Sequence, residues 1–254
     1  MKNMTEIYLS VIIPAYNEKE NFEKGVLDKV TKFLKTQKYS WEILIVDDGS
    51  NDGSVDLFEK FVKKHSGFKL IKNPHMGKAG AIIKGVQKAK GKYILFTDFD
   101  QATPLSEFAK LHPYLKKGFD VVIGSREVKG AKREEEPFYR HLMGKGFNFG
   151  IRIMAVRGIS DTQCGFKAFK GKVAKKLFTK IQVCKPTLIK SAFTGSIDVE
   201  ILFLAQKFGY KIAEVPIFWK HIETTRINPI KDSFLMALEV IKIRLYDLLG
   251  RYED

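Results

Sequence analysis

The sequence predicts an α/β fold in which a mainly parallel central sheet is flanked by helices, with an amphipathic helix at the C-terminal end. In the first half of the chain, short β-rich runs alternate with helical patterns, which is typical of parallel βα units. The strands are almost continuous in Val, Ile, Leu and Phe, as in strands that are buried on both faces. This Rossmann-like order indicates that ligands bind where the strands end, at the carboxyl edge of the sheet.

The first half supplies five expected strands and four expected helices. Each strand is a short β-rich run, and each helix fills the longer segment between two strands. The strands are expected at Tyr8–Ile13, Glu42–Val46, Lys69–Lys72, Lys92–Thr97 and Asp120–Ile123. The helices are expected at Lys19–Gln37, Ser54–Lys64, Lys78–Ala89 and Pro104–Lys116.

The second half is less regular. Pro137–Val156 is basic, aromatic and compatible with a helix, and a helix at Ile197–Phe208 precedes a strand at Lys211–Trp219. An amphipathic helix is expected at Ile230–Leu249, because its apolar residues recur at helical spacing. These residues are Phe234, Leu235, Leu238, Ile241, Leu245, Leu248 and Leu249. Their shared face either packs on the domain or helps to dock the protein on a membrane surface, and both interpretations stay open.

The charge balance favours an anionic partner. Lys and Arg number 44 against 29 Asp and Glu, so the 254-residue chain has a formal net charge of +15. Phosphorylated small molecules, an anionic membrane surface and nucleic acid all suit such an excess. Nucleic-acid binding is the remote alternative, because only eight of the basic residues are Arg and no recognition motif is found.

Cysteine content and hydropathy indicate the redox compartment and the kind of membrane contact that the chain allows. Cys164 and Cys184 are the only cysteines, so no disulfide framework is expected and a reducing compartment is the default. No run approaches the roughly 18 apolar residues of a membrane-spanning helix. We therefore expect any membrane contact to be peripheral.

The strongest chemical motif is an aspartate pair that follows the buried strand ending at Phe96. Asp98 and Asp100 are two residues apart, so both carboxylates can reach one Mg²⁺ or Mn²⁺ together with diphosphate oxygens. Taken alone, the same pattern also fits an ordinary turn after a strand.

Two further polar clusters follow the first two strands. Pro14, Tyr16 and Glu18 follow the first strand, and Asp47 and Asp48 follow the second. An aromatic ring can stack on a nucleobase, and a carboxylate can accept from ring N–H groups or ribose hydroxyls. We expect the three clusters to meet at one edge of the sheet.

In this order and spacing, Val11–Glu18, Val46–Ser50 and Asp98–Asp100 resemble the motifs of inverting glycosyltransferases of family 2, which have the A-type nucleotide-sugar fold. Asn73–Ala81 resembles that family's glycine–lysine–glycine segment, with Ala79 in place of the middle glycine. The resemblance implies that Gly77 and Lys78 help to bind the substrate.

Later motifs are similar to those of polyprenol-phosphate glycosyltransferases, above all the dolichyl-phosphate β-glucosyltransferases. They are Ile123–Arg126, Pro137–Arg140, Asp161–Lys167, Ile197–Glu200 and Phe218–Trp219. The resemblance implies a donor of UDP-glucose, a polyprenyl or dolichyl phosphate acceptor, and Gln163 as a substrate-binding residue. We expect a catalytic domain over residues 1–229, followed over residues 230–254 by the amphipathic helix, which packs on the domain or lies at the membrane surface.

The expected reaction assigns roles to the remaining candidates. Asp98 and Asp100 hold the metal and diphosphate, and Arg126, Arg140 and Arg226 position acceptor or donor phosphates. A phosphate acceptor is already anionic and needs no strong base. The alternative is a soluble family 2 enzyme acting on a sugar or lipid hydroxyl, which needs a carboxylate base.

The candidate bases for that alternative are Asp198, Glu200 and Asp161. The first two are two residues apart on the predicted helix, so at most one is expected to point inward. Glu200 is otherwise expected at a solvated helix position.

The distribution of charge suggests where the protein acts. Residues 162–197 contain eight Lys and no acid, whereas the predicted metal end is acidic. A basic second half suits an anionic membrane surface, so we expect a cytoplasmic protein that lies peripherally at the cytoplasmic face of a membrane.

Overall fold

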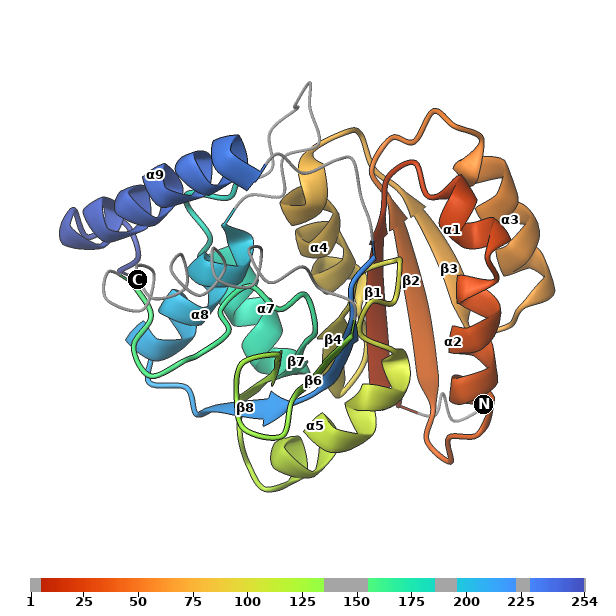
Figure 1. The fold of residues 1–254 in the computed structure, drawn as a ribbon, viewed down its shortest axis with the longest axis horizontal. Coiled ribbons are helices and arrows are strands. Elements are labelled where there is room, and N and C mark those ends of the chain that lie inside the picture. The colour runs from red at the N-terminus through yellow and green to blue at the C-terminus, as the bar shows by residue number, and fades with distance from the viewer. Residues whose placement is uncertain (1–5, 135–154, 186–195, 223–228, 254) are drawn as a thin grey trace.

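The computed structural model describes residues 6–134, 155–185, 196–222 and 229–253, with the side chains of 229–233 left aside. Its main sheet has seven strands in the order β3-β2-β1-β4-β7-β5-β8, and all pairs are parallel except those of β7 (Figure 1). The strands are β1 Leu9–Ala15, β2 Trp41–Asp47, β3 Phe68–Lys72, β4 Tyr93–Phe96, β5 Val121–Ser125, β7 Lys167–Lys170 and β8 Ile212–Pro216. The predicted, mainly parallel α/β sheet is confirmed.

Helices cover both faces of this sheet, because alternate strand residues point to opposite sides. In β1, Ile12 packs toward α4, α7 and α8, whereas Val11 and Ile13 pack toward α2, α3 and α5 (Figure 1). The helices are α1 Lys19–Glu23, α2 Val26–Lys35, α3 Ser54–Lys64, α4 Gly77–Lys88, α5 Phe108–Lys116, α7 Gly171–Thr179, α8 Ile197–Lys207 and α9 Pro229–Leu248. Two hydrophobic cores therefore hold the sheet between its helical layers.

Three predicted elements are wrong in detail. The expected helix Lys19–Gln37 is two helices, because Gly25 adopts a left-handed conformation (φ 71°) between α1 and α2. The expected helix from Pro104 begins instead with a 3₁₀ turn, Leu105–Glu107. The expected strand Lys211–Trp219 divides at Ile217, where the chain leaves β8 to form β9 Phe218–Lys220, which pairs with β6 Lys132–Glu134 in a separate small sheet.

The two C-terminal helices are predicted within a residue or two, but they differ in environment. Every residue of α8 from Ile197 to Ala205 is buried, whereas α9 lies at the outside of the molecule (Figure 1). Among the described residues, no helix combines the length and apolarity needed to cross a bilayer. Most of the helix-compatible segment Pro137–Val156 lies outside the described residues.

Candidate functional site

The loops after β1, β2 and β4 meet at the carboxyl edge of the sheet. β1 and β2 pair in parallel up to their last residues, Ala15 and Asp47, and the Asp48 amide donates to the Ala15 carbonyl over 2.8 Å. On the other side of β1, the Thr97 amide after β4 donates to the Ile12 carbonyl over 3.1 Å. The predicted convergence of the three polar clusters is confirmed. They are Pro14–Glu18, Asp47–Asp52 and Asp98–Thr103.

Lys78 brings a positive charge to the aspartate pair. It lies in the first turn of α4, and its Nζ is 2.6 Å from Oδ1 of Asp98. Burial alone would lower the pKa of Lys78, but the carboxylates of Asp98 and Asp198 raise it above its usual range. The lysine is therefore a fixed cation at this point of the edge.

Asp100 is the carboxyl group whose charge is most disfavoured here. Burial and the neighbouring charge of Asp98 raise its pKa to about 6, although the Ala102 amide donates to its Oδ1 over 2.9 Å. Two carboxylates held this close favour a cation between them. Among the described residues, no group of three or more His, Cys, Asp or Glu side chains is clustered like metal ligands. Two protein carboxylates completed by diphosphate oxygens would fit Mg²⁺ or Mn²⁺.

Gly165 lies against the side chain of Asp98. A Cβ atom at this position would lie 2.2 Å from Oδ2 of Asp98, so a side chain here would require the carboxylate or the loop to move. The approach follows from β7, which pairs antiparallel with β4 and sets Lys167 opposite Phe96. The antiparallel strand thus carries the Asp161–Lys167 motif to the carboxyl edge.

A buried ion pair lies behind this glycine. Lys167 is fully buried, and its Nζ donates to Oδ1 of Asp198 and to the Cys164 carbonyl, each over 2.5 Å. Asp198 is in the first turn of α8. Burial raises the pKa of the Cys164 thiol to about 12, which supports the expected structural role of this cysteine.

Arg126 is bound to Asp161. Its Nε and Nη2 donate to the two carboxylate oxygens over 2.7 and 2.9 Å, and its guanidinium lies 5.4 Å from the ring centroid of Trp219. Burial alone would raise the pKa of Asp161, but Arg126 lowers it to about 2. Asp161 is therefore unsuited to act as a base.

Glu200 is a structural residue rather than the solvated side chain expected from the sequence. It is fully buried, and its carboxylate accepts from the amides of Gln182, Val183 and Cys184, each over 2.8 Å. The Tyr252 hydroxyl also donates to it over 2.7 Å. The expectation that only one of Asp198 and Glu200 points inward is wrong, because α8 is enclosed on all sides over this stretch.

Asp48 organises the loop before α4. Its carboxylate accepts from the amides of Met76 and Gly77 over 3.0 and 2.8 Å and lies 2.8 Å from Nδ1 of His75. The His75 ring stacks on Tyr16, with centroids 4.3 Å apart. Asp48 thus holds an aromatic pair at the edge where a nucleobase is expected.

Two buried acceptor atoms beside this pair have no hydrogen-bond partner within the described part of the chain. Asp47 accepts from the amides of Gly49 and Ser50 through Oδ2, whereas its Oδ1 is unpartnered. Nδ1 of His75 faces two acceptors of Asp48, so it carries the hydrogen, and the unpartnered Nε2 is an acceptor in the neutral ring. Both atoms suit a ligand that donates N–H groups.

The remaining predicted site residues lie in different parts of the structure. Glu18 is buried, accepts from Nδ2 of Asn21 over 2.6 Å and raises the pKa of Asp100 through its charge. Pro14 lies in β1, and Gln163 contacts Met236 of α9 over 3.6 Å. Arg140 and Arg226 lie outside the described residues.

Sequence reasoning missed three residues of the site. Gly165 and Lys167 lie within a motif that was singled out, but their contacts depend on the antiparallel β7, which was not predicted. His75 lies in the segment that resembles the family's glycine–lysine–glycine loop, two residues before Gly77, and this location is the signal that could have identified it.

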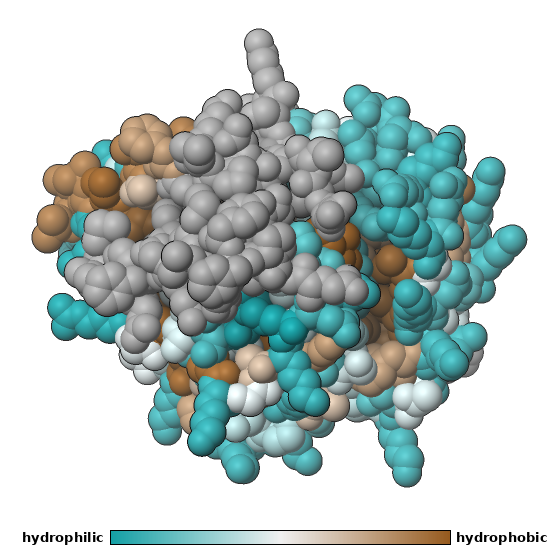
Figure 2. Space-filling view, in the orientation of Figure 1, coloured by the Kyte–Doolittle hydropathy of each residue, from teal (hydrophilic) through white to brown (hydrophobic). Residues whose placement is uncertain are grey.

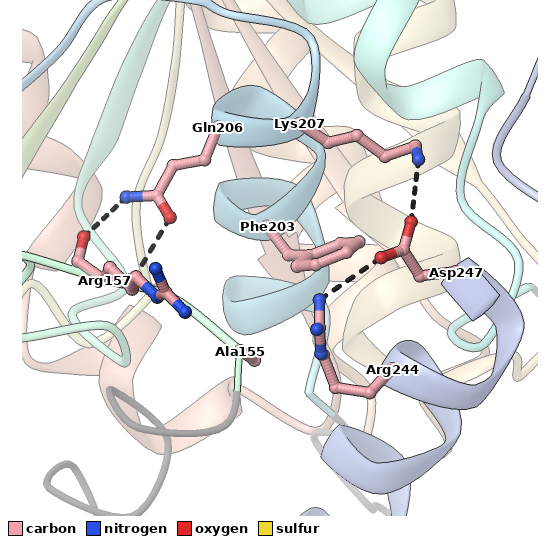
Figure 3. Close-up of a pocket in the computed structure, with 7 residues that line it drawn as sticks. All are labelled: Ala155, Arg157, Phe203, Gln206, Lys207, Arg244 and Asp247. Atoms are coloured by element: carbon pink, nitrogen blue, oxygen red, sulfur yellow. Dashed lines mark hydrogen bonds and ion pairs between the residues drawn. The ribbon is translucent and has the colours of Figure 1, made fainter.

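A separate cavity of about 270 Å³ lies between α8 and α9 (Figure 3). None of the predicted site residues lines it. The lining residues are Ala155, Arg157, Phe203, Gln206, Lys207, Arg244 and Asp247.

Comparison with known proteins relates the whole chain to one enzyme family. The model of glycosyl transferase family 2 matches residues 10–178. A dolichyl-phosphate beta-glucosyltransferase of Dictyostelium discoideum is 38% identical over 258 residues, covering 96% of this chain and 76% of the relative. The enzyme of the same name from Saccharomyces cerevisiae is 36% identical, covering 98% of this chain and 78% of the relative.

Among solved structures, glucosyl-3-phosphoglycerate synthase of Mycobacterium tuberculosis, in complex with Mn²⁺, UDP and glucosyl-3-phosphoglycerate, has a similar fold. The TM-score is 0.61 at 20% sequence identity, and the match covers 96% of this chain and 80% of the other. This likeness confirms the predicted nucleotide-sugar fold.

Proposed function

The chain belongs to glycosyl transferase family 2, and we propose that it transfers glucose from UDP-glucose to dolichyl phosphate or a related polyprenyl phosphate, with inversion at the anomeric carbon. The names of relatives that match nearly the whole chain support this sugar and acceptor. The observation that carries the proposal is the aspartate pair, Asp98 and Asp100, at the ligand-binding edge of the sheet, where the charge of Asp98 raises the pKa of Asp100 and Lys78 is paired with Asp98.

The donor nucleoside is assigned to the edge formed by β1 and β2. Tyr16 and His75 provide aromatic surface for the base. The unpartnered Oδ1 of Asp47 and Nε2 of His75 are acceptors for N–H groups, of which a uracil ring offers one at N3. Glu18 follows β1 and acts electrostatically on Asp100, so we assign it to the ribose or the diphosphate.

The diphosphate is assigned to Asp98 and Asp100. Mg²⁺ or Mn²⁺ held by these carboxylates would neutralise the charge that develops on the leaving group. Lys78 adds a fixed positive charge at the same point and holds Asp98 in place. Gly165 lies against Asp98 and leaves no room there for a side chain while the carboxylate keeps its position.

The acceptor is a phosphate oxygen that is already anionic, so no proton has to be removed before it attacks. In a single in-line displacement, the new bond from this oxygen to the anomeric carbon forms as the bond to the UDP oxygen breaks, and the configuration inverts. The state of the nearby carboxylates supports this mechanism over a hydroxyl acceptor. Asp198 is paired with Lys167, Asp161 with Arg126, and Glu200 with three amides.

Cations for the acceptor phosphate are expected from the Arg-containing motifs. Arg126 is partly exposed beside Trp219, and Arg140 and Arg226 remain candidates from the sequence. Because its acceptor is a membrane lipid, we place the enzyme peripherally at the cytoplasmic face of a membrane that carries anionic lipid.

Replacing either aspartate tests the proposal. Asp98→Asn and Asp100→Asn are each expected to lower metal-dependent glucose transfer at least about 100-fold, since each removes a charge that stabilises the diphosphate. The matched control is Asp56→Asn on the exposed face of α3, which removes the same charge away from the edge. Unchanged UDP-glucose binding and unchanged transfer in both site variants would contradict the proposal.

A further inference from the structure

The outer side of α9 carries an apolar stripe. Within the described part of the chain, the large exposed apolar side chains are all on α9 or at the residue that follows it, where Figure 2 shows a hydrophobic area. They are 40–78% exposed, and those from Phe234 to Leu248 recur every three or four residues, so they form one line along the helix. This outer stripe consists of Phe234, Leu238, Ile241, Leu245, Leu248 and Leu249.

The opposite side of α9 packs against the domain. Val240 and Ile243 are fully buried in the core that contains α8. Glu239 accepts from the Ser196 amide over 2.6 Å, immediately before α8, and Met236 contacts Gln163. The outer stripe is therefore the free face of a helix whose other face is fixed in place.

Positive charge flanks the outer stripe. Among the described α9 side chains, the exposed charged ones are Lys242 and Arg244, and both are cations. Arg244 also lines the cavity of Figure 3 together with Arg157 and Lys207, where Asp247 is the one carboxylate of the lining. Asp247 pairs with both Lys207 and Arg244, which leaves this flank with net positive charge.

We infer that α9 docks the protein on a bilayer containing anionic lipid, with the outer stripe inserted at the level of the acyl chains. An apolar face of this extent is unusual on a soluble surface. A helix with one apolar face and cations beside it lies in the plane of a membrane interface, where the cations meet anionic head groups. The formal net charge of +15 favours the same surface.

Charge also argues against a second copy of the chain as the occupant of the stripe. A symmetric dimer places the same surface on both sides of its interface, so it would gather Lys242 and Arg244 of both copies there, with no exposed acid among the described α9 side chains to offset them. A bilayer with anionic head groups supplies the opposite charge instead.

Docking would hold the carboxyl edge of the sheet, which carries Asp98 and Asp100, next to the membrane. The inner side of α9 contacts Gln163, two residues before the Gly165 that covers Asp98, and the Ser196 amide, two residues before Asp198. A lipid-borne phosphate would then reach the site beside the N-terminal half of α9. This consequence rests on the proposed function, whereas the docking itself does not.

Vesicle sedimentation tests the docking. The wild-type chain is expected to sediment with phosphatidylcholine vesicles that contain phosphatidylserine. The double variant Ile241→Asp/Leu245→Asp is expected to bind these vesicles at least about tenfold more weakly, because two apolar side chains that would enter the membrane are replaced by charged ones. The matched control, Lys172→Ala/Lys175→Ala on the exposed side of α7, lowers the net charge by the same two units and is expected to keep most of its binding. Circular dichroism establishes that each variant is folded.

A second variant separates the contribution of charge. Lys242→Gln/Arg244→Gln is expected to lose the preference for phosphatidylserine while keeping its weaker binding to pure phosphatidylcholine. Equal sedimentation of the wild type and Ile241→Asp/Leu245→Asp would overturn the inference, as would a wild-type dimer, seen by sedimentation velocity, that this variant dissociates. Transfer to a short, water-soluble polyprenyl phosphate is measured in parallel. If the wild type does not transfer glucose to this soluble acceptor, the proposed function is rejected, whereas the docking result still holds.

Discussion

At the scale of single residues, Gly165 lies so near Asp98 that a side chain at this position would displace the carboxylate or the loop. Gly165→Ala would bring a methyl group to 2.2 Å from Oδ2 of Asp98, so the carboxylate or the loop must move. We expect a loss of about 10–100-fold in Mn²⁺-dependent UDP binding, as for other groups that orient a metal ligand. Isothermal titration with UDP and Mn²⁺ measures this.

The control for that prediction is Gly209→Ala. Gly209 has open space around its Cα but a φ of 71°, so the alanine variant carries backbone strain without touching the site. It is expected to be less stable and to bind UDP normally. Equal UDP binding by Gly165→Ala and the wild type would show that the glycine does not position Asp98.

The Arg126–Asp161 pair makes a prediction about pH. Because the folded-state pKa of Asp161 is about 2, below its ordinary value of 3.8, the pair stabilises the fold above pH 3.8 and loses this contribution as the pH falls through 2. Asp161→Asn leaves Arg126 without its charged partner and is expected to lower the free energy of unfolding at pH 7 by about 3 kcal/mol. Urea unfolding should show the difference between variant and wild type narrowing from pH 4 toward pH 2. A difference that stays constant over this range would contradict the assignment.

At the scale of elements, α8 shows where pattern reasoning reaches its limit. A spacing of two residues separates Asp198 and Glu200 to different sides of the helix, and that much is correct. Both sides are nevertheless buried, because α8 lies beneath α9 and contacts α7, while Tyr252 near the chain end reaches Glu200. Tertiary packing that brings distant segments together cannot be derived from the helix's own sequence.

The two acids of α8 should respond differently to substitution. Glu200→Gln replaces an acceptor of several amides and is expected to lower the free energy of unfolding by about 1–3 kcal/mol, while the folded enzyme keeps its transfer rate. Asp198→Asn is expected to reduce transfer to a lipid phosphate by less than about tenfold, whereas removal of a general base costs about 100-fold or more. Transfer rates at saturating donor, together with urea unfolding curves, distinguish these outcomes. A 100-fold loss in Asp198→Asn would favour a hydroxyl acceptor.

The strands show the same division between local and long-range information. The parallel strands β1, β2 and β4 are predictable because each is rich in buried apolar residues. β7 reads Lys167–Lys170, with lysine at both ends, and β6 is a three-residue polar segment, so neither has a strand signal of its own. Their pairing comes from the fold around them.

At the scale of the whole molecule, the sequence places the acidic edge correctly because the ends of parallel strands must coincide. The contacts of Gly165 and Lys167 with that edge could not be predicted, since they require the antiparallel return of β7. The orientation of α9 was open for a related reason. Some apolar residues of α9 are buried against the domain and others are exposed. Only the packed structure shows which residues form the inner face and which form the outer stripe.

The central claim is that the aspartate edge uses a nucleotide-sugar to glycosylate a lipid phosphate. The most direct measurement incubates the protein with radiolabelled UDP-glucose, dolichyl phosphate and Mg²⁺ or Mn²⁺, with UDP-N-acetylglucosamine and GDP-mannose as competing donors in parallel reactions. The account predicts label in the organic phase from UDP-glucose, dependent on the metal and on dolichyl phosphate, and abolished in Asp98→Asn. Label that stays in the aqueous phase with every donor, or that enters the organic phase equally well in Asp98→Asn, would contradict it.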